Sequence, residues 1–478
     1  MNYFFYDLET SGLSAKYDRI MQFAGQRTDE NFTEVGEPVN LLVRLEEDTL
    51  PSPSAIMVTK ITPQKTHLDG ITEKEFCDYV QTEIFTPETI VIGYNSVRFD
   101  DEFMRYTFWR NFYDPYQWEW KDGRGRWDLL DVVRMTRALR PGGIVWPMQK
   151  KKDALVPVNR LEYLTKLNGI EHEHAHDALA DVFGLIGVTR LLKTHQPKIF
   201  QYLFSVRDKN HVTGLINLQN PQPFVYSSGR YENEFNKTTV AYPLCPGQNG
   251  NIIVYDLRYN LEDILEKAKS DSEFSFYPII KELAPNKCPA VAPLGVLEEK
   301  TECETYQVIG EDETVKSGDS LTTGWEKIGL TKEMVEKNLK ILQSHPEFVN
   351  TIKNRPKKTY DSPTEIEGAL YDGFLSDRDQ TICEAVRNAG ADKLTNFHPK
   401  FADKRLPELL IHYKAKNYPD SLTDSEKEDY KKYRFARLNR QSSNFLKELE
   451  ELDKSPEKDK YIIDELKLWY QNLQDGDY

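Results

Sequence analysis

The chain has 478 residues, of which 39% are hydrophobic and 29% are charged. At roughly 150 residues per domain, this length favours about three domains, and the composition excludes a collagen-like, low-complexity or wholly disordered chain. The net charge of −15 argues against a protein that coats nucleic acid through bulk attraction, although an acidic enzyme can still carry one basic groove. No apolar run reaches the roughly 18 residues that a membrane span needs, so we expect a soluble protein that does not contact membranes.

The cysteines point to a reducing compartment. They are odd in number, scattered, and form no C-x-x-C pair: Cys77, Cys245, Cys288, Cys303 and Cys383. A disulfide framework or a thiolate zinc site is therefore not expected, and a cytoplasmic location is. With only nine histidines in the chain, any metal should be a hard ion held by oxygen ligands.

Residues 1–190 alternate strand and helix patterns, which predicts an α/β layer architecture. Strands are predicted at 3–9, 34–45 and 89–95. Amphipathic helices are predicted at 72–85, 101–113, 127–139, 159–169 and 177–195. The Pro-, Gly- and Lys-rich segment 141–158 predicts a functional loop.

The pattern changes after this region. Residues 197–355 predict a small β-rich domain with strands at 211–218, 222–229, 238–244 and 251–257. The acidic segment 298–320 predicts a solvent-exposed insertion, and a helix at 331–345 closes the unit. Residues 358–478 are almost entirely helical in pattern and rich in charge. No repeat or coiled-coil pattern occurs, so we expect a monomer.

Asp7 and Glu9 end the first predicted strand. Alternate residues of a strand project to one face, so both carboxylates should point together while Leu8 points away. Two adjacent negative charges are costly unless they are neutralised, and divalent cations would neutralise them. Because the chain has 77 acidic residues, an exposed pair at a strand edge is an alternative interpretation.

Two further acidic motifs follow. Asp100 and Asp101 open the helix after the buried strand 89–95, at the strand-to-helix crevice where open α/β sheets place their sites. Asp177 and Asp181 share a helix face four residues apart, with His176 just before them. The alternatives are a helix cap for each first acid and a structural hydrogen bond for the histidine.

Together the three motifs predict a two-metal phosphoryl-transfer site. Carboxylates from three elements would hold two Mg²⁺ ions, roughly 4 Å apart, and His176 would accept the proton of the attacking water. The spacing alone does not decide between Asp100 and Asp101, or between Asp177 and Asp181.

The motifs YDLET, GYNSVRFDDEF and AHDALAD resemble those of the DEDDh exonucleases. Longer stretches, such as RWDLLDVVRMTRALRPGGIVWP and DKRLPELLIHYKAKNYP, resemble the bacterial exonuclease I family over nearly the whole chain. The resemblance implies an RNase H-like exonuclease domain at 1–190, an SH3-like domain at 197–355 and a helical domain at 358–478. It implies Mg²⁺-dependent 3′→5′ hydrolysis of single-stranded DNA to 5′-mononucleotides in DNA repair and recombination, with Mn²⁺ as a possible substitute.

The resemblance also implies residue roles. Asp7, Glu9, Asp100 and Asp181 would bind the metals and His176 would act as general base, with Asp101 and Asp177 in capping roles. The positions expected to contact the DNA strand, besides Glu9, are Arg105, Tyr116, Trp120, Arg134, Arg160, Lys209, Asn251, Lys281, Asn286 and Tyr371. For each aromatic residue among them core packing is the alternative, and for each basic residue a solvated surface charge.

The family is associated with the acidic tail of single-strand-binding protein, and Arg140 is a candidate for that contact. Residues 296–322 do not follow the family pattern, which leaves any partner surface there open. Two other functions remain as alternatives: a DEDDh ribonuclease, and a catalytically silent single-strand-binding scaffold with the same fold. The presence of all four carboxylates and the histidine argues against the scaffold.

Overall fold

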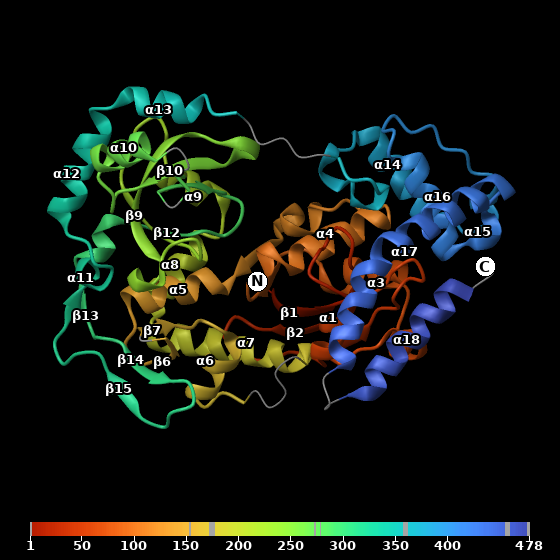
Figure 1. The fold of residues 1–478 in the computed structure, drawn as a ribbon, viewed down its shortest axis with the longest axis horizontal. Coiled ribbons are helices and arrows are strands. Elements are labelled where there is room, and N and C mark those ends of the chain that lie inside the picture. Colours follow the sequence, from red (N-terminus) through yellow and green to blue (C-terminus); the bar gives the residue numbers. More distant parts are fainter. Residues whose placement is uncertain are drawn as a thin grey trace.

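The computed structural model describes residues 2–152, 154–171, 177–271, 274–277, 279–356, 362–454 and 459–475. The N-terminal part lies in the middle of the molecule, with the β-rich part at one end and the C-terminal helices at the other (Figure 1). Within the described residues no helix is both long and apolar enough to cross a membrane.

The central sheet has the order β3-β2-β1-β4-β5. Its strands are β1 (Asn2–Thr10), β2 (Ile20–Thr28), β3 (Val39–Leu42), β4 (Thr89–Gly93) and β5 (Gly125–Asp128). β1 is antiparallel to β2 and parallel to β4, and β4 is parallel to β5. The sequence prediction missed β2, and it extended the third strand well beyond its four residues.

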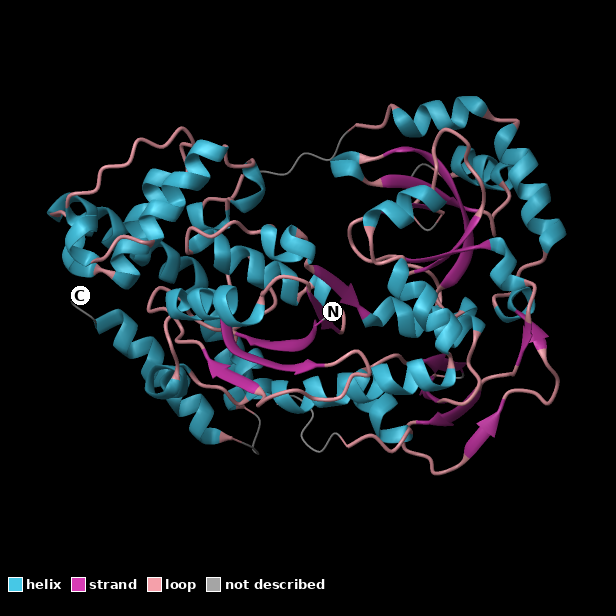
Figure 2. Ribbon diagram, turned by 180° about the vertical axis from the view of Figure 1, so that it is seen from behind, coloured by secondary structure: helices cyan, strands magenta, loops and turns pink. Residues whose placement is uncertain are grey.

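Helices cover both faces of this sheet (Figure 2). Tyr3 and Phe5 of β1 pack in one core with α7 (Ala178–His195), whereas Phe4 and Tyr6 pack in another core with α4 (Asp100–Arg110). The other helices of this part are α1 (Pro53–Thr59), α2 (Pro63–Asp69), α3 (Glu73–Tyr79), α5 (Leu129–Leu139) and α6 (Leu161–Leu167). The strand therefore presents odd-numbered residues toward α7 and even-numbered residues toward α4, as its alternation requires.

Segment 141–158, predicted as a loop, instead contains the antiparallel strands β6 (Val145–Lys151) and β7 (Ala154–Pro157). The acidic segment 298–320 is also not a simple exposed insertion. It contains β13 (Lys300–Thr301), β14 (Thr305–Val308) and β15 (Thr314–Lys316), and β14 pairs in parallel with β6. Sequence reasoning did not find this sheet because the pair that joins its two halves, β6 with β14, comes from segments more than 150 residues apart.

The β-rich part forms a five-stranded sheet of order β11-β10-β9-β8-β12. The strands are β8 (Phe224–Ser227), β9 (Thr238–Pro246), β10 (Ile252–Asp256), β11 (Ile280–Leu283) and β12 (Ala290–Pro293). The strand predicted at 211–218 is wrong, because the structure has helix α9 (Lys209–Leu215) there, capped by the Asp208 side chain. Around the sheet lie α8 (Pro197–Ser205), α10 (Leu261–Ser270), α12 (Lys332–Gln343) and α13 (Pro346–Lys353), with β16 (Thr322–Thr323) and α11 (Gly324–Lys327) joining the last two to the sheet.

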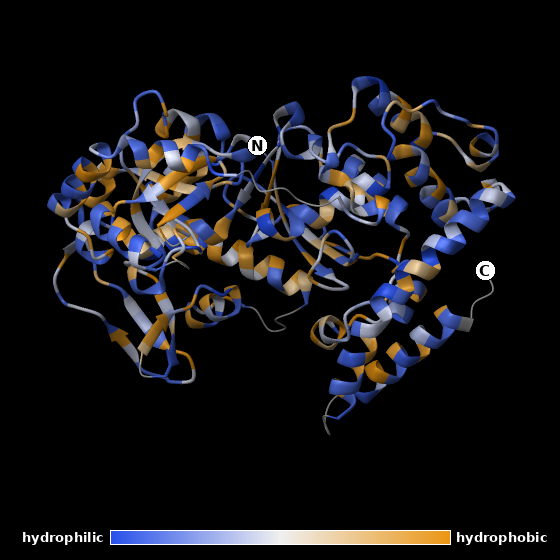
Figure 3. Ribbon diagram, turned by 45° about the horizontal axis from the view of Figure 1, so that its top comes forward, coloured by the Kyte–Doolittle hydropathy of each residue, from blue (hydrophilic) through white to orange (hydrophobic). Residues whose placement is uncertain are grey.

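The C-terminal part is helical, as predicted. It comprises α14 (Asp377–Arg387), α15 (Ala391–Thr395), α16 (Leu406–Asn417), α17 (Asp424–Asp453) and α18 (Lys460–Asp475). Apolar and polar residues alternate along α17 and α18 (Figure 3). Their apolar residues share a core with the N-terminal part, in which Leu438, Phe445 and Leu466 pack with Met21 and Leu45. The C-terminal helices are thus packed directly onto the sheet-containing part.

Candidate active site

Three carboxylates meet at the end of β1. Asp7 and Glu9 project from β1 toward the α7 side, and Asp181 lies in the first turn of α7. One carboxylate oxygen from each residue lies within 4.8 Å of the other two, which is close enough for all three to hold one metal ion. The alternative of an exposed pair at a sheet edge is wrong, since β1 is flanked on both sides by paired strands.

Asp177 is the cap of α7, as the resemblance implied. Its carboxylate accepts hydrogen bonds from the backbone N–H groups of Leu179 and Ala180, at 3.0 and 3.4 Å. Such a cap fixes the first helical turn and therefore the position of Asp181. His176 lies outside the described residues.

Asp100 begins α4 at the carboxyl end of β4, and its side chain is buried. Asp101 has a different role from the cap that we expected. It lies on the face reached by Tyr6, whose hydroxyl donates a hydrogen bond to it, and it forms a 2.5 Å ion pair with Arg126. Asp101 is thus neutralised within the protein, which leaves Asp100 as the carboxylate available to the site.

Burial and neighbouring acids act on the pKa values of Asp7, Glu9 and Asp100. Burial, followed by the neighbouring carboxylates, raises the pKa of Asp7 and of Asp100 well above the usual range, and burial beside Asp181 raises that of Glu9 to about 8. Within the described part of the chain, none of these three groups forms an ion pair with a basic side chain. A divalent cation would supply the missing positive charge, and all the ligands are the hard oxygens that Mg²⁺ prefers.

Several residues predicted to contact a strand gather next to Asp100. Arg105 is buried, pairs with Glu119 at 2.5 Å and Glu102 at 2.9 Å, and lies 5.4 Å from the Tyr116 ring centre. The Tyr371 hydroxyl donates a hydrogen bond to Glu102 and accepts one from Arg105 at 3.2 Å. Arg105, Tyr116 and Tyr371 therefore form one cluster, in which the Arg105 charge is already balanced by carboxylates.

Two further residues belong to this cluster and were missed in the sequence. Lys287 of the β-rich part approaches Glu102 at 3.4 Å, and the ring of Phe374 contacts that of Tyr116 with centroids 5.7 Å apart. Phe374 is 85% exposed and Trp120 is 64% exposed. A signal for Phe374 was present, because it lies in the ALYDGF stretch that resembles the family.

The remaining predicted contacts are more dispersed. Arg134 pairs with Asp131 at 2.5 Å, and the mostly exposed Arg160 lies 3.6 Å from Glu162. Lys209 is exposed at the start of α9. Asn251 donates a hydrogen bond to Glu282 at 3.1 Å, and the backbone carbonyl of Asn286 accepts one from Arg126 at 2.8 Å.

Lys281, one of the residues expected to contact the DNA strand, is buried in the β-rich part. Its residue is only 4% exposed, and its ammonium group lies 4.4 Å from the centre of the Tyr231 ring. Burial, acting mainly through desolvation, lowers the pKa of this lysine. The contact between Lys281 and DNA stays a prediction, with the side chain buried beside Tyr231 in this structure.

Comparison with known proteins agrees with this architecture. Residues 4–189 match the family model described as Exonuclease, residues 207–308 match the Exonuclease I SH3-like domain, and residues 364–473 match the Exonuclease I C-terminal domain. The chain is 36% identical to exodeoxyribonuclease I of Haemophilus influenzae over 468 residues, which is 94% of this chain and 93% of that protein.

Solved structures are similar over the whole chain. The crystal structure of E. coli exonuclease I in complex with a dA16 oligonucleotide matches with a TM-score of 0.85 and 32% identity, covering 99% of both chains. A zinc-bound form of an E. coli exonuclease I complex with single-stranded DNA matches with the same TM-score and identity, covering 99% of this chain and 98% of that one. The fold and site thus define a three-part exonuclease. The chain belongs to the exonuclease I family, whose members hydrolyse phosphodiester bonds from a chain end.

Proposed function

We propose that the protein is a Mg²⁺-dependent 3′→5′ exonuclease that degrades single-stranded DNA to 5′-mononucleotides during DNA repair and recombination. The observation that carries this proposal is the convergence of Asp7, Glu9 and Asp181, whose carboxylate oxygens lie within 4.8 Å of one another, with the charge of the buried Asp100 near enough to raise the pKa of Asp7. Oligonucleotide complexes of its structural relatives support single-stranded DNA as the substrate. We further propose domains at 1–190, 197–355 and 358–478, a monomeric state, and a cytoplasmic location that suits its free cysteines.

The four carboxylates fit a pair of Mg²⁺ ions, with Mn²⁺ as a substitute. When bound, such ions lower the pKa of a water molecule and stabilise the leaving oxygen of a phosphodiester. The residues of the chain do the rest. Asp7, Glu9, Asp100 and Asp181 hold the ligand geometry, His176 takes the proton of the attacking water, and Arg160 holds the terminal nucleotide.

The route of the strand follows from the cluster beside Asp100. Glu102 is contacted by Arg105 of the N-terminal part, Lys287 of the β-rich part and Tyr371 of the C-terminal part. A strand that ends at the carboxylates would thus pass a point where all three parts meet, with Tyr116, Trp120 and Phe374 available for base stacking. Enclosure of this kind favours processive digestion, because a threaded strand dissociates slowly between cuts.

Digestion of end-labelled single strands tests the proposal. With Mg²⁺, the 3′ label should be lost at once as mononucleotide, while EDTA or Asp181→Ala should stop the reaction. Equal activity on RNA would favour a DEDDh ribonuclease instead, and intact substrate in every lane would favour a binding scaffold. An enzyme that redistributes after every cut would contradict processivity.

We also propose a site for the acidic tail of single-strand-binding protein. A cavity of about 750 Å³ lies between the N-terminal and β-rich parts and is lined by Arg140, His195, Lys198 and Lys300 among others. Arg140 pairs there with the exposed Glu299 at 2.7 Å, so residues 296–322 contribute to this surface. An acidic peptide should bind with an affinity that Lys198→Glu abolishes and Glu299→Gln increases, as measured by fluorescence anisotropy. Unaltered affinity in both variants would exclude this cavity as the site.

A further inference from the structure

The loop that follows the metal-binding strand is closed at its base. Ser11 donates its backbone N–H to the carbonyl of Arg19, and the N–H of Arg19 donates to the Ser11 hydroxyl, both at 2.9 Å. Ser11 is only two residues beyond Glu9. The position of loop 11–19 therefore fixes the end of β1 and, with it, the direction of the Glu9 side chain.

The pairing of β1 with β2 is irregular at this point. Glu9 lies opposite Gln22, whereas Thr10 lies opposite Ile20, so Met21 is the extra residue of a β-bulge. Bulges next to active sites redirect neighbouring side chains. Met21 is 1% exposed and packs in the core that contains Leu438 and Phe445 of α17. The bulge beside Glu9 is thus held by the C-terminal part.

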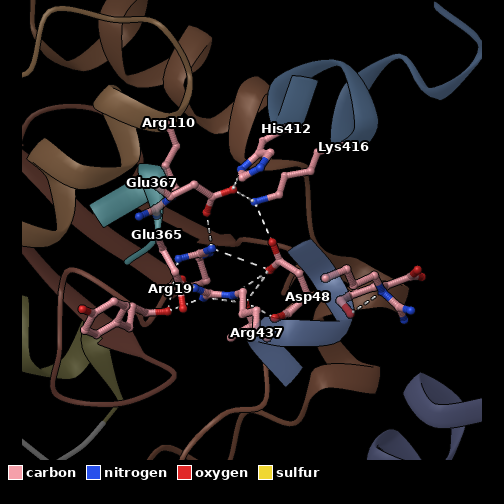
Figure 4. Close-up of polar contacts among 12 residues, drawn as sticks. Arg19, Asp48, Arg110, Glu365, Glu367, His412, Lys416 and Arg437 are labelled. Atoms are coloured by element: carbon pink, nitrogen blue, oxygen red, sulfur yellow. Dashed lines mark hydrogen bonds and ion pairs between the residues drawn. The ribbon is translucent and has the colours of Figure 1, made fainter. Parts of the chain in front are cut away.

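Arg437 of α17 reaches the same loop from the other side. Its guanidinium group is fully buried and donates hydrogen bonds to the carbonyl of Tyr17 at 2.6 Å and to that of Asp48 at 2.9 Å, while it also pairs with Glu365. Arg19, at the end of the loop, pairs with Glu367 at 2.5 Å. Figure 4 shows these side chains converging from both parts of the chain.

We propose that Arg437 and Met21 are positioning residues through which the C-terminal part sets the geometry of the metal-binding carboxylates; this inference rests on the metal site proposed above. Arg437 is fully buried, and its hydrogen bonds and ion pairs with described residues involve none of the four carboxylates. It fixes the Tyr17 carbonyl within loop 11–19, and Met21 fixes the bulge opposite Glu9. The C-terminal part therefore has a role in metal binding that is separate from any contact that it makes with DNA.

The test measures metal and DNA binding separately in Arg437→Met and Met21→Ala. Mn²⁺ is titrated by electron paramagnetic resonance, and single-stranded DNA is titrated by fluorescence anisotropy in EDTA. Changes to the groups that orient metal ligands typically weaken metal affinity by about 10- to 100-fold. We expect a loss of at least about tenfold in Mn²⁺ affinity in both variants by the same principle, with DNA affinity unchanged.

Arg434→Met is the matched control. Arg434 lies one turn earlier on α17 and donates a hydrogen bond to the carbonyl of Glu47 at 3.1 Å, a residue outside loop 11–19. It should therefore leave Mn²⁺ affinity unchanged. Should Arg437→Met fail to fold, Met21→Ala leaves the ionic contacts in place and decides the question alone. Wild-type Mn²⁺ affinity in the variants would overturn the inference, whereas a wild-type protein that binds no Mn²⁺ would overturn the proposed metal site itself.

Discussion

Two clusters of carboxylates in the described part of the chain differ in the positive charge that lies beside them. Asp7, Glu9 and Asp100 lie among other acids, and burial together with those neighbours raises their pKa values. At the junction with the C-terminal part, burial opposes ionisation of Glu367 as well, but Lys416 and Arg19 lower its pKa well below the usual range. Glu367 contacts Lys416 at 2.7 Å and Arg19 at 2.5 Å.

The difference shows that burial alone does not identify a functional carboxylate. In both clusters burial opposes ionisation, and both come from residues far apart in the sequence. What distinguishes them is the positive charge beside them. Glu367 pairs with the protein's own Arg19 and Lys416, whereas the carboxylates on β1 would be neutralised by a bound metal ion. A group of carboxylates such as Asp7, Glu9 and Asp100, which pair with no basic side chain in the described part of the chain, is therefore the feature that indicates a metal site here.

Removing one carboxylate from the proposed metal site should have the largest effect. Asp181→Ala removes charge that the metals require, so the hydrolysis rate should fall by roughly 10³-fold or more, because metal ions supply several kcal/mol of transition-state stabilisation. Release of labelled mononucleotide at saturating Mg²⁺ measures this loss. Asp177→Ser retains a capping side chain on α7 and should keep most of the activity. Equal loss in both variants would show that the helix, and not the ligand, had been disturbed.

Removing a carboxylate from the cluster at the junction should instead affect stability. Glu367→Gln leaves Arg19 and Lys416 buried with less opposing charge, and breaking a buried pair in this way costs about 3–5 kcal/mol. Urea denaturation followed by circular dichroism measures the free energy of unfolding. Glu428→Gln, which alters an exposed pair with Lys432 on α17, serves as the control and should change little. A stability loss no greater than that of the control would contradict the assignment of a structural role.

The two clusters should also respond to pH in opposite directions. Without metal, the folded protein holds a proton on Glu9 up to about pH 8, whereas the unfolded chain releases it near 4.5. The folded state therefore binds more protons within this window, and the free energy of unfolding should fall as the pH rises through it. Thermal unfolding in EDTA measures this trend. Mg²⁺ should restore the free energy of unfolding at pH 8. Glu9→Gln should make the free energy of unfolding less dependent on pH in this window.

Glu367 gives the opposite slope at acid pH. Because its pKa is lowered on folding from the ordinary value of 4.5, the stability it contributes is present above that value. It should be lost as the pH falls below that value toward the lower folded pKa, since the unfolded chain then binds more protons. Glu367→Gln should therefore reduce the loss of stability at acid pH and leave the pH dependence between 4.5 and 8 unchanged. A variant that altered the pH dependence in both ranges would show that the two clusters are coupled electrostatically.

Sequence reasoning located one cluster and not the other. The acidic motifs on β1, α4 and α7 lie at recognisable strand and helix ends, so local pattern predicted one shared site. The choice of Asp100 over Asp101 and of Asp181 over Asp177 came only from the family resemblance. The junction offers no such pattern, since Arg19 and Glu367 are 348 residues apart and meet only through tertiary packing. The same limit explains the missed ion pair of Asp101 with Arg126 and the burial of Lys281, because neither can be read from neighbouring residues.

The smallest expected effect is that of Phe374→Ala on DNA binding. It separates a contact of the C-terminal part with DNA from the effect of that part on metal binding. Phe374 is exposed beside Tyr116 and takes no part in the junction. If it stacks on a base, Phe374→Ala should weaken DNA binding in EDTA by about tenfold, at the lower end of the 1–3 kcal/mol that a stacked base contributes. Mn²⁺ affinity should stay unchanged, which is the reverse of the result expected for Arg437→Met.

Phe435→Ala controls for the loss of an exposed aromatic side chain from the same part of the chain, since Phe435 is 65% exposed on α17. Equal DNA affinity in the wild type and in Phe374→Ala would exclude stacking at this residue. Opposite results for Phe374 and Arg437 would instead show that one domain acts on two steps by separate physical routes. Its exposed aromatic surface would hold the strand, and its buried cations would hold the loop that orients the carboxylates.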